Sequence, residues 1–320
     1  MSVTESHPCL TVLFPGALTT VQDLGRVGYQ RLGIAESGSM DTLSAVLANR
    51  LLNNPDTAAV LEIALIGPKL RFLAPTWLSL TGADISPRLD GSSLETGASF
   101  RADEGQVLSF GHCRKGLRTY LSVKGGFDVP VILGSRSTYL YAGFGGYQGR
   151  ALAKGDILGA LNQDGTQACT LERLPAEFNL PEDGPREIRV VMGPHEDRFT
   201  IEGIHRFQSG TYEVTPDSNR MGYRLDGPRI AHVDSPIVVS EATPMGAVQI
   251  PGEGKPVILL RERGTTGGYT KIACVIRCDV DVLAQMPAGG RLRFVPVSVD
   301  EAHELERRRW QAVNQWKAPR

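Results

Sequence analysis

The sequence predicts a mainly β protein with a few helices, on three observations. Short apolar or alternating runs recur along the chain, each bounded by Gly, Pro or Asp. The 320 residues include 36 Gly and 20 Pro, which supply the many turns. Hydrophobic residues make up 41% and charged residues 22%, as in an ordinary globular protein. Strands this short and this numerous close best into barrels or sandwiches.

The expected strands share one pattern, a few residues of β-forming type between turn residues. In chain order they are 69–73, 77–80, 106–110, 119–123, 187–192, 236–240, 256–260, 271–276 and 291–295.

Four helices are expected from apolar residues at helical spacing and from capping residues. Asp41 is placed to cap the first, and Ser298 with Glu301 forms a capping box for the last. Their expected ranges are 42–53, 195–207, 279–286 and 299–313.

The segment 173–186 is the best domain boundary, because it carries three prolines, several charges and little apolar periodicity. It predicts an N-terminal domain over 1–180 and a C-terminal domain over 181–320.

Charge and cysteine content narrow the function classes. A net charge of −1 gives no electrostatic case for binding nucleic acid or an anionic membrane surface. Neither a secretory signal nor a run of about 20 apolar residues is found, so a cytoplasmic location is expected. The five cysteines are odd in number and scattered, which favours free thiols over disulfides or a metal site.

The first site-like segment is 15–41, where polar side chains alternate with glycines. Gln22, Asp23, Arg26 and Gln30 lie in one run and supply amides, a carboxylate and a guanidinium. The alternative is a turn-rich segment whose Asp and Arg simply pair. The run RVGY at 26–29 is echoed by RMGY at 220–223, which suggests two related halves.

The second half offers charged groups with two interpretations each. Arg220 and Arg224 share one face if the segment is extended, so they either meet an anion or pair with Asp217 and Asp226. Glu241 lies in an apolar run and is either a buried partner of an arginine or a general base.

Two further features of this half concern anions and protons. His195 precedes an expected helix and is as plausible a capping residue as a catalytic one. Residues 265–269, TTGGY, together with Lys271, look like a backbone nest for a carboxylate or phosphate, although such a sequence is more often only a turn.

Three sequence motifs are absent. The chain has no P-loop, no G-x-S-x-G nucleophile elbow and no Met-Lys-Met biotin attachment site. Any biotin would therefore be carried by another protein.

Seven segments spread along the chain form a recognisable set. They are TTVQDLGRVGYQ (19–30), GIAESGSMD (33–41), LTGAD (80–84), YLSVKGGFDVPVILGSRSTY (120–139), SNRMGYRLDGP (218–228), GAVQIPGEGKP (246–256) and TTGGYTKIACV (265–275). Together they resemble one family, the C subunits of the bacterial ATP-dependent 5-oxoprolinases, which are related to the carboxyltransferase region of urea carboxylase.

The resemblance implies two cyclophilin-like β-barrel carboxyltransferase subdomains. It implies ATP-dependent opening of 5-oxoproline to L-glutamate, with Mg²⁺ as counterion of the ATP and with no biotin bound covalently to this chain. The A and B subunits of the 5-oxoprolinase are the expected partners, with the B subunit in direct contact.

The same resemblance implies the site residues. Glu241, Arg220 and Lys271 are expected to be catalytic. Substrate or nucleotide is expected to be bound by Gln22, Asp23, Arg26, Gln30, Asn219, Tyr223, Arg224, Gln249, Thr265, Thr266, Gly267, Gly268 and Tyr269. One departure concerns substrate identity: where the family usually has Asp-x-Gln before TTGGY, this chain has Glu262, Arg263 and Gly264, so an amide group is lost.

Two alternatives remain open at this point. One is a biotin-dependent carboxyltransferase component acting on urea, guanidine or a similar amide. The other is a non-catalytic regulatory protein that binds a partner resembling the B subunit.

Overall fold

The computed structural model describes residues 6–161, 171–178, 180 and 184–316. The chain separates into two compact units. Unit 1 is Met1–Arg26, Ser37–Pro181 and Trp316–Arg320, and unit 2 is Val27–Glu36 and Glu182–Gln315. Residues 27–36 thus belong to unit 2, although the sequence placed them in an N-terminal domain. Part of the expected boundary segment, 179 and 181–183, lies outside the described residues.

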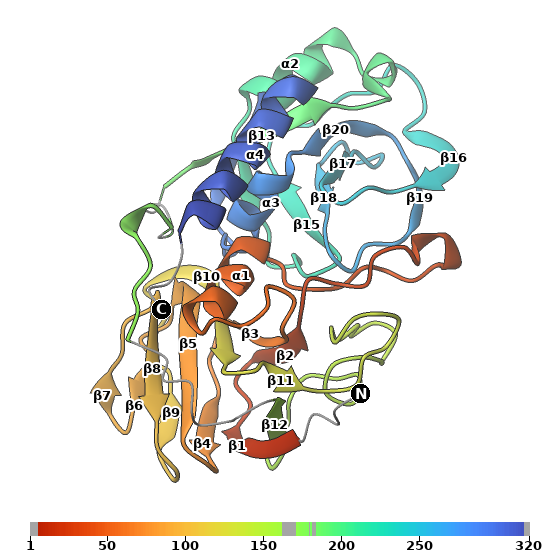
Figure 1. Ribbon diagram of the computed structural model, residues 1–320. Coiled ribbons are helices and arrows are strands. Elements are labelled where there is room, and N and C mark those ends of the chain that lie inside the picture. The colour runs from red at the N-terminus through yellow and green to blue at the C-terminus, as the bar shows by residue number, and fades with distance from the viewer. Residues whose placement is uncertain (1–5, 162–170, 179, 181–183, 317–320) are drawn as a thin grey trace. The chain divides into compact units, whose positions relative to one another are not determined.

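Unit 1 is built from two antiparallel sheets (Figure 1). The first, in the order β11-β12-β1-β4-β9-β6-β7, contains Phe127–Asp128, Ile157–Leu161, Ser6–Phe14, Lys69–Phe72, Val107–Ser109, Arg88–Leu89 and Ser92–Ser93. The second, in the order β2-β3-β10-β5-β8, contains Leu18–Gln22, Val60–Ala64, Lys115–Val123, Thr76–Asp84 and Ala98–Ala102. One apolar cluster, including Leu10, Phe72 and Leu121, is drawn from both sheets.

Helix α1 (Thr42–Leu51) packs against strands β5 and β10 of the second sheet. As predicted, the Asp41 side chain caps it by accepting a hydrogen bond from the Ser44 amide. Ser79 on β5 donates through its hydroxyl to the Ala48 carbonyl, so the helix is also hydrogen-bonded to the sheet.

Unit 2 contains a closed barrel in the order β13-β20-β17-β18-β15-β14-β21. Its strands are Arg186–Met192, Lys271–Val275, Ala247–Gln249, Val257–Leu259, Gly222–Asp226, Tyr212–Val214 and Arg291–Pro296. Strands β13 and β21 pair in parallel. The prediction of a mainly β protein with a few helices is confirmed. Of the two architectures that the short strands left open, barrel or sandwich, unit 2 has the closed barrel.

A two-stranded ribbon of β16 (Ile237–Ala242) and β19 (Thr266–Tyr269) lies outside the barrel order (Figure 1). Its pairing places Glu241 opposite Gly267. Most of β16 is exposed.

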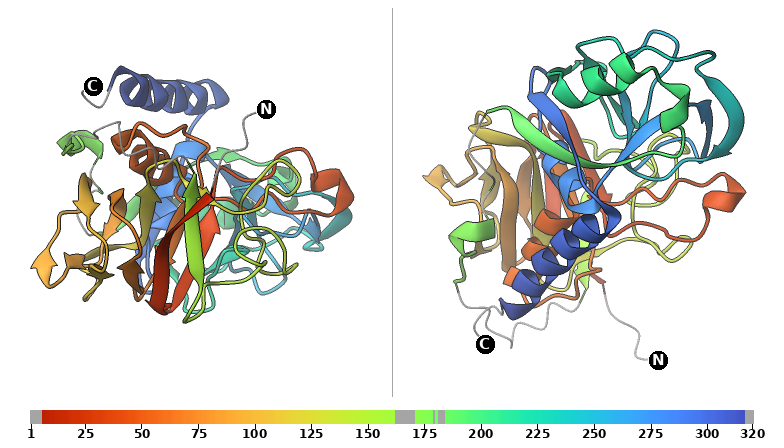
Figure 2. Two further views of the ribbon diagram at one scale, coloured as in Figure 1. Left: turned by 60° about the horizontal axis from the view of Figure 1, so that its bottom comes forward. Right: turned by 90° about the horizontal axis from the view of Figure 1, so that it is seen from above.

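The remaining helices are α2 (Ile201–Ser209), α3 (Arg277–Ala284), α4 (Val299–Gln315) and the 3₁₀ turns η1 (Gln30–Leu32), η2 (Ala176–Phe178) and η3 (Glu196–Arg198). Figure 2 shows α4 as one unbroken helix. It begins with the predicted capping box, since the Glu301 amide donates to the Ser298 hydroxyl and the Ser298 amide donates to the Glu301 carboxylate.

The expected helix over 195–207 is wrong in its first part. After η3 the chain is extended at Phe199, and α2 starts only behind Thr200, whose hydroxyl accepts from the Gly203 amide. Thr is a preferred residue at the N-terminal cap of a helix. Because Thr200 caps α2, the helix begins at the next residue, Ile201.

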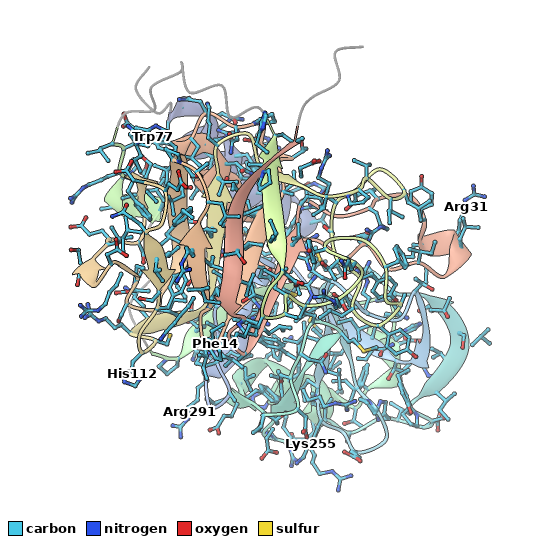
Figure 3. All side chains as sticks on the ribbon, turned by 90° about the horizontal axis from the view of Figure 1, so that it is seen from below. Phe14, Arg31, Trp77, His112, Lys255 and Arg291 are labelled. Carbon is cyan, nitrogen blue, oxygen red and sulfur yellow. The ribbon has the colours of Figure 1, made fainter. Side chains whose placement is uncertain are left out.

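The side-chain amide of Gln30 helps to hold the segment Val27–Glu36 within unit 2. Gln30 donates through Nε2 to the Thr243 carbonyl at 3.0 Å and to the Thr265 carbonyl at 3.1 Å. Its neighbour Arg31 is exposed, and Figure 3 shows that side chain extending outward from η1. The amide of Gln30 therefore has a structural task, in joining this segment to the chain around β16 and β19.

Asp23 organises a buried network in unit 1. Its carboxylate accepts four hydrogen bonds at 2.5 to 2.8 Å, from the amides of Gly25 and Arg136 and from the hydroxyls of Ser135 and Ser137. Asp23 is only 8% exposed. The network fixes the segment 135–137 against the end of β2.

Arg26 and Gln22 extend this network. Arg26 is 1% exposed, donates to the Ser137 carbonyl at 2.6 Å and lies over the ring of Phe144 at 4.9 Å. Gln22 donates to the Thr138 carbonyl and accepts from the Gly38 amide.

Replacing Asp23 by Asn is expected to lower the free energy of unfolding of unit 1 by roughly 2–4 kcal/mol, because an amide NH₂ would face donors that are now satisfied. Urea denaturation followed by tryptophan fluorescence measures the change. Asp103→Asn is the matched control, because the Asp103 side chain is exposed and its ion pair with Arg101 is long, at 3.6 Å. This variant should change the free energy of unfolding by less than about 0.5 kcal/mol. Equal stability of the two variants would contradict the structural role of Asp23.

Candidate functional site

Lys271 and Glu241 form a partly buried ion pair in unit 2. Lys271 is the first residue of β20 and its side chain is 3% exposed, whereas the Glu241 side chain on β16 is 45% exposed. The Lys271 Nζ donates to Glu241 Oε1 at 2.5 Å. A buried ammonium requires a counter-charge, and the ribbon supplies it.

His195 completes this cluster. The backbone amide of Lys271 donates to His195 Nδ1 at 3.0 Å, and His195 Nε2 lies 3.4 Å from Glu241 Oε1. Because Nδ1 accepts a hydrogen bond, the ring proton lies on Nε2 and faces the carboxylate. The cluster thus joins a carboxylate, an ammonium and an imidazole.

A close backbone approach holds His195 in this position. Two residues before it, a Cβ on Gly193 would lie 2.5 Å from the Lys271 carbonyl oxygen, nearer than any side chain allows. Gly193 therefore lets the end of β13 pass directly beside β20.

The carboxylate of Glu241 is ionised and partly exposed. The hydrogen bond from Lys271 lowers the pKa of Glu241 below its ordinary value, and burial opposes this more weakly. Glu241 is consequently ionised at neutral pH, and its exposure lets it reach a ligand.

Strand pairing aligns Arg224, Val257 and Gln249 in one row on the outer face of the barrel. Arg224 on β15 lies opposite Val257 on β18, and Val257 lies opposite Gln249 on β17. Paired residues on neighbouring strands point to the same face of a sheet. Gln249 is paired in turn with Lys271 on β20, across a shift in the strand register.

The alternate residues point into the barrel core. Tyr223, Ile258, Val248 and Ala273 are opposite one another in the same four strands and are at most 1% exposed. This alternation confirms that the row with Arg224 and Gln249 faces outward.

A cavity of about 240 Å³ lies over this row. It is lined by Asn219, Met221, Gly222, Arg224, Gln249, Pro251, Val257, Leu259, Gly264 and Tyr269. Gln249 is 7% exposed, and its Nε2 has no hydrogen-bond partner among the described residues. A Cβ on Gly267 would lie 2.7 Å from that Nε2, so the ribbon closes over the amide at a glycine.

The structure thus brings together several residues that the sequence singled out. Glu241 and Lys271 are in direct contact, and Gln249 lies opposite Lys271. Five of the expected binding residues line the cavity or cover it: Asn219, Arg224, Gln249, Gly267 and Tyr269.

The expected anion nest at TTGGY is wrong. Residues Thr266–Tyr269 form strand β19, and neither Gly267 nor Gly268 has a positive φ. A nest needs successive amides that converge, whereas amides alternate in direction along a strand. The carbonyl of Thr265 accepts hydrogen bonds from Gln30 and from the Thr243 amide.

Arg220 has a buried carboxylate partner. Its Nε donates to Glu262 Oε1 at 2.6 Å, and the two side chains are 5% and 3% exposed. Of the two interpretations offered for Arg220, the ion pair therefore describes its geometry. Its partner is Glu262, and not Asp217 or Asp226. Tyr223 is also structural, because its ring lies in the barrel core and its hydroxyl donates to the Met286 carbonyl at 3.3 Å.

The residues of the first half are used internally. Gln22, Asp23 and Arg26 hold the network of unit 1, and Gln30 anchors the segment 27–36 in unit 2. The alternative interpretation of 15–41, in which its polar groups bond within the protein, therefore describes these residues. Asp23 nevertheless pairs with hydroxyls and amides, and not with Arg26.

The apolar floor of the cavity was not predicted from the sequence. Pro251, Val257 and Leu259 line it, and the usable signal was the alternation of 257–259, which places Ile258 inward and its neighbours outward. His195 was left open between two roles, and its position beside Glu241 depends on a contact that local sequence does not encode.

The described residues offer no metal centre of the usual kind. Among them, no group of three or more His, Cys, Asp or Glu side chains is arranged to hold a metal ion. No helix in the described ranges is long and apolar enough to cross a membrane.

Comparison with known proteins places the chain in a family. Residues 32–296 match the model of the carboxyltransferase domain, subdomain A and B. The chain is 37% identical over 295 residues to the C subunit of 5-oxoprolinase from Escherichia coli, covering 92% of this chain and 93% of that protein. It is 35% identical to urea amidolyase of Lachancea kluyveri, but spans only 18% of that longer protein.

Solved structures support the same family. The crystal structure of Kluyveromyces lactis urea carboxylase superposes with a TM-score of 0.90 at 33% identity, over 98% of this chain and 30% of that one. The resemblance seen in the sequence motifs is confirmed, and the chain belongs to the carboxyltransferase domain family, subdomains A and B, which includes the 5-oxoprolinase C subunits.

Proposed function

We propose that this chain is the C subunit of an ATP-dependent 5-oxoprolinase complex, which opens 5-oxoproline to L-glutamate. The observation that carries the proposal is the cluster of Glu241, Lys271 and His195 beside a cavity lined by hydrogen-bond donors. A carboxylate base next to an anion-compatible cavity suits hydrolysis of a cyclic amide that bears a carboxylate. Similarity to the Escherichia coli protein supports the same function.

Glu241 is assigned the proton transfers. Its ionised Oε accepts a proton from water as the water oxygen bonds to the ring carbonyl carbon, and the protonated carboxyl then gives a proton to the ring nitrogen as the carbon–nitrogen bond breaks. Lys271 holds the carboxylate in place through its 2.5 Å hydrogen bond. His195 directs its Nε2 proton to the same oxygen and fixes its orientation.

The cavity over Arg224 and Gln249 suits a ligand smaller than ATP. Its 240 Å³ and single arginine suit a ligand smaller than a drug-sized molecule, for which about 300–1,000 Å³ is typical. We therefore assign no step of nucleotide chemistry to these residues, and we place the binding of ATP and its Mg²⁺ elsewhere in the complex.

The A and B subunits of the 5-oxoprolinase are the proposed partners, with the B subunit in direct contact, and the proposed location is the cytoplasm. The partners would supply what the cluster lacks, a phosphate-binding site.

A second candidate is a biotin-dependent carboxyltransferase component acting on urea or a similar amide. Similarity to urea amidolyase and urea carboxylase favours it. Because the chain has no Met-Lys-Met motif, a separate protein would carry the biotin.

The isolated chain is expected to be nearly inactive, and the complex with both partners is expected to release ADP only when 5-oxoproline is present. Coupled spectrophotometric detection of ADP measures this. Avidin, which sequesters biotin, should leave the rate unchanged. Loss of activity with avidin, together with turnover of urea, would support the carboxyltransferase candidate instead.

Glu241→Gln should lower turnover of 5-oxoproline by the assembled complex by about 10²-fold or more, because the base is lost while the hydrogen bond to Lys271 is kept. Glu253→Gln is the matched control, since Glu253 is an exposed carboxylate of the same unit. Rates are normalised to folded, partner-bound protein. Normal turnover in Glu241→Gln would exclude Glu241 as the base.

The pH dependence tests the role of Lys271. Its hydrogen bond lowers the pKa of Glu241, so the ionised base persists to a lower pH, and the acidic limb of kcat/KM should lie below the ordinary pKa of a glutamate. Lys271→Met removes the bond, so this limb should move to higher pH. An unchanged limb in a folded Lys271→Met complex would mean that the pair does not control the titration.

A further inference from the structure

We infer that Gln30 is a positioning residue for the base Glu241, because its side-chain amide holds the end of the ribbon that carries this carboxylate. The role of Glu241 as a base rests on the proposed function. The hold of Gln30 on the ribbon rests on hydrogen bonds within unit 2.

The amide of Gln30 contacts both strands of the ribbon at the same end. Strand β16 ends at Ala242, β19 begins at Thr266, and these two residues are paired. The Nε2 of Gln30 donates to the carbonyls of the two adjoining residues, Thr243 at 3.0 Å and Thr265 at 3.1 Å. One side chain therefore bridges the two chain segments directly beyond the last pair of the ribbon.

Arg263 supports the same end of the ribbon. Its Nε donates to the Thr243 carbonyl at 2.8 Å, so this carbonyl accepts two hydrogen bonds. Arg263 is only 4% exposed, and its Nη2 lies 3.6 Å from the carboxylate of Glu36. The same Nη2 donates to Gln30 Oε1 at 3.5 Å. The segment 27–36 thus contributes an amide and a carboxylate to one hydrogen-bonded cluster at the base of the ribbon.

The far end of the ribbon gives Glu241 little support. The ribbon has two strands and most of β16 is exposed, and such a pair is marginally stable without further packing. The strand register shifts between Ile237 and Glu241, which separates the pair at Ile237 from the pairs at Glu241 and Ala242. The position of Glu241 therefore depends on the end at Thr243, two residues or roughly 7 Å away along the strand.

The geometry around Glu241 is sensitive to a shift of β16. Its Oε1 lies 2.5 Å from Lys271 Nζ and 3.4 Å from His195 Nε2, and these are the titratable groups that face it. Across the ribbon it faces Gly267, which carries no charge. A catalytic group displaced by about 1 Å can lose roughly 10²-fold in rate. Loss of the Gln30 amide should therefore impair the base without removing it.

The test is Gln30→Met, in the full chain and in the assembled complex. Methionine has nearly the volume of glutamine but no amide, so the two carbonyls lose their donor while packing is kept. We expect kcat to fall by about tenfold with little change in KM, because Gln30 acts on the base and not on the substrate. Gln311→Met is the matched control, since Gln311 is exposed on α4 of the same unit, and it should keep the unaltered rate.

The titration of Glu241 gives a measurement that does not depend on turnover. The hydrogen bond from Lys271 lowers the pKa of Glu241, so displacement of β16 should raise this pKa toward its ordinary value. Carbon-13 NMR of the side-chain carboxyl in the full 320-residue chain measures the change. Gln311→Met should leave the pKa of Glu241 where it is.

A second background separates positioning from a general effect on stability. In Glu241→Gln the base is absent, so the addition of Gln30→Met should lower the remaining turnover no further. If Gln30→Met does not fold, Gln30→Asn takes its place. The shorter side chain keeps an amide but no longer spans to both carbonyls, and the pKa of Glu241 should again rise.

The outcomes distinguish this inference from the proposed function. A raised pKa of Glu241 in Gln30→Met, in a chain whose complex never turns over 5-oxoproline, would support the positioning of the carboxylate and remove the reaction. Turnover by the complex with pKa and kcat unchanged in Gln30→Met would overturn the positioning role and leave the reaction. Equal losses of turnover in both backgrounds, with an unchanged pKa, would make Gln30 a residue of the fold alone and would also overturn the inference.

Discussion

The burial of one ammonium group determines the arrangement of the candidate site. Lys271 begins β20 with a side chain that is 3% exposed, so its charge must be neutralised by a neighbour. Glu241 does this from the ribbon, and the backbone amide of Lys271 orients His195 toward the same carboxylate. If the ribbon did not lie against this end of β20, the carboxylate and the imidazole would have no common position.

The ribbon also connects the ion pair to the cavity. Gly267 lies opposite Glu241 in the ribbon, and a side chain there would collide with the Gln249 amide. The glycine therefore permits one close contact that both places the base and encloses a hydrogen-bond donor. Close backbone approach thus explains this glycine of TTGGY, where the sequence suggested an anion nest.

Local patterns in the sequence predicted most of the fold, because strand alternation and helix capping depend on neighbours a few residues apart. The cap at Asp41 and the capping box at Ser298 are examples. Partners distant in sequence could not be predicted in this way. Arg220 pairs with Glu262, 42 residues away, and Asp23 meets Ser137, 114 residues away. The placement of 27–36 in unit 2 likewise depends on Gln30 reaching the carbonyls of Thr243 and Thr265 in the second half of the chain.

The site-like segment 15–41 and the candidate site of unit 2 both contain carboxylates and arginines. The two differ in how many hydrogen bonds these groups already make within the protein. Asp23 accepts four donors inside unit 1 and leaves its carboxylate no capacity to bind a ligand, whereas Glu241 is held by Lys271 and keeps a 45% exposed side chain. Arg26 is buried against carbonyls and an aromatic ring, whereas Arg224 is exposed at a cavity. Polar groups whose hydrogen bonds are all made within the protein stabilise the fold, whereas groups with free capacity can bind a ligand. The chemistry of this chain is therefore best sought in the candidate site of unit 2.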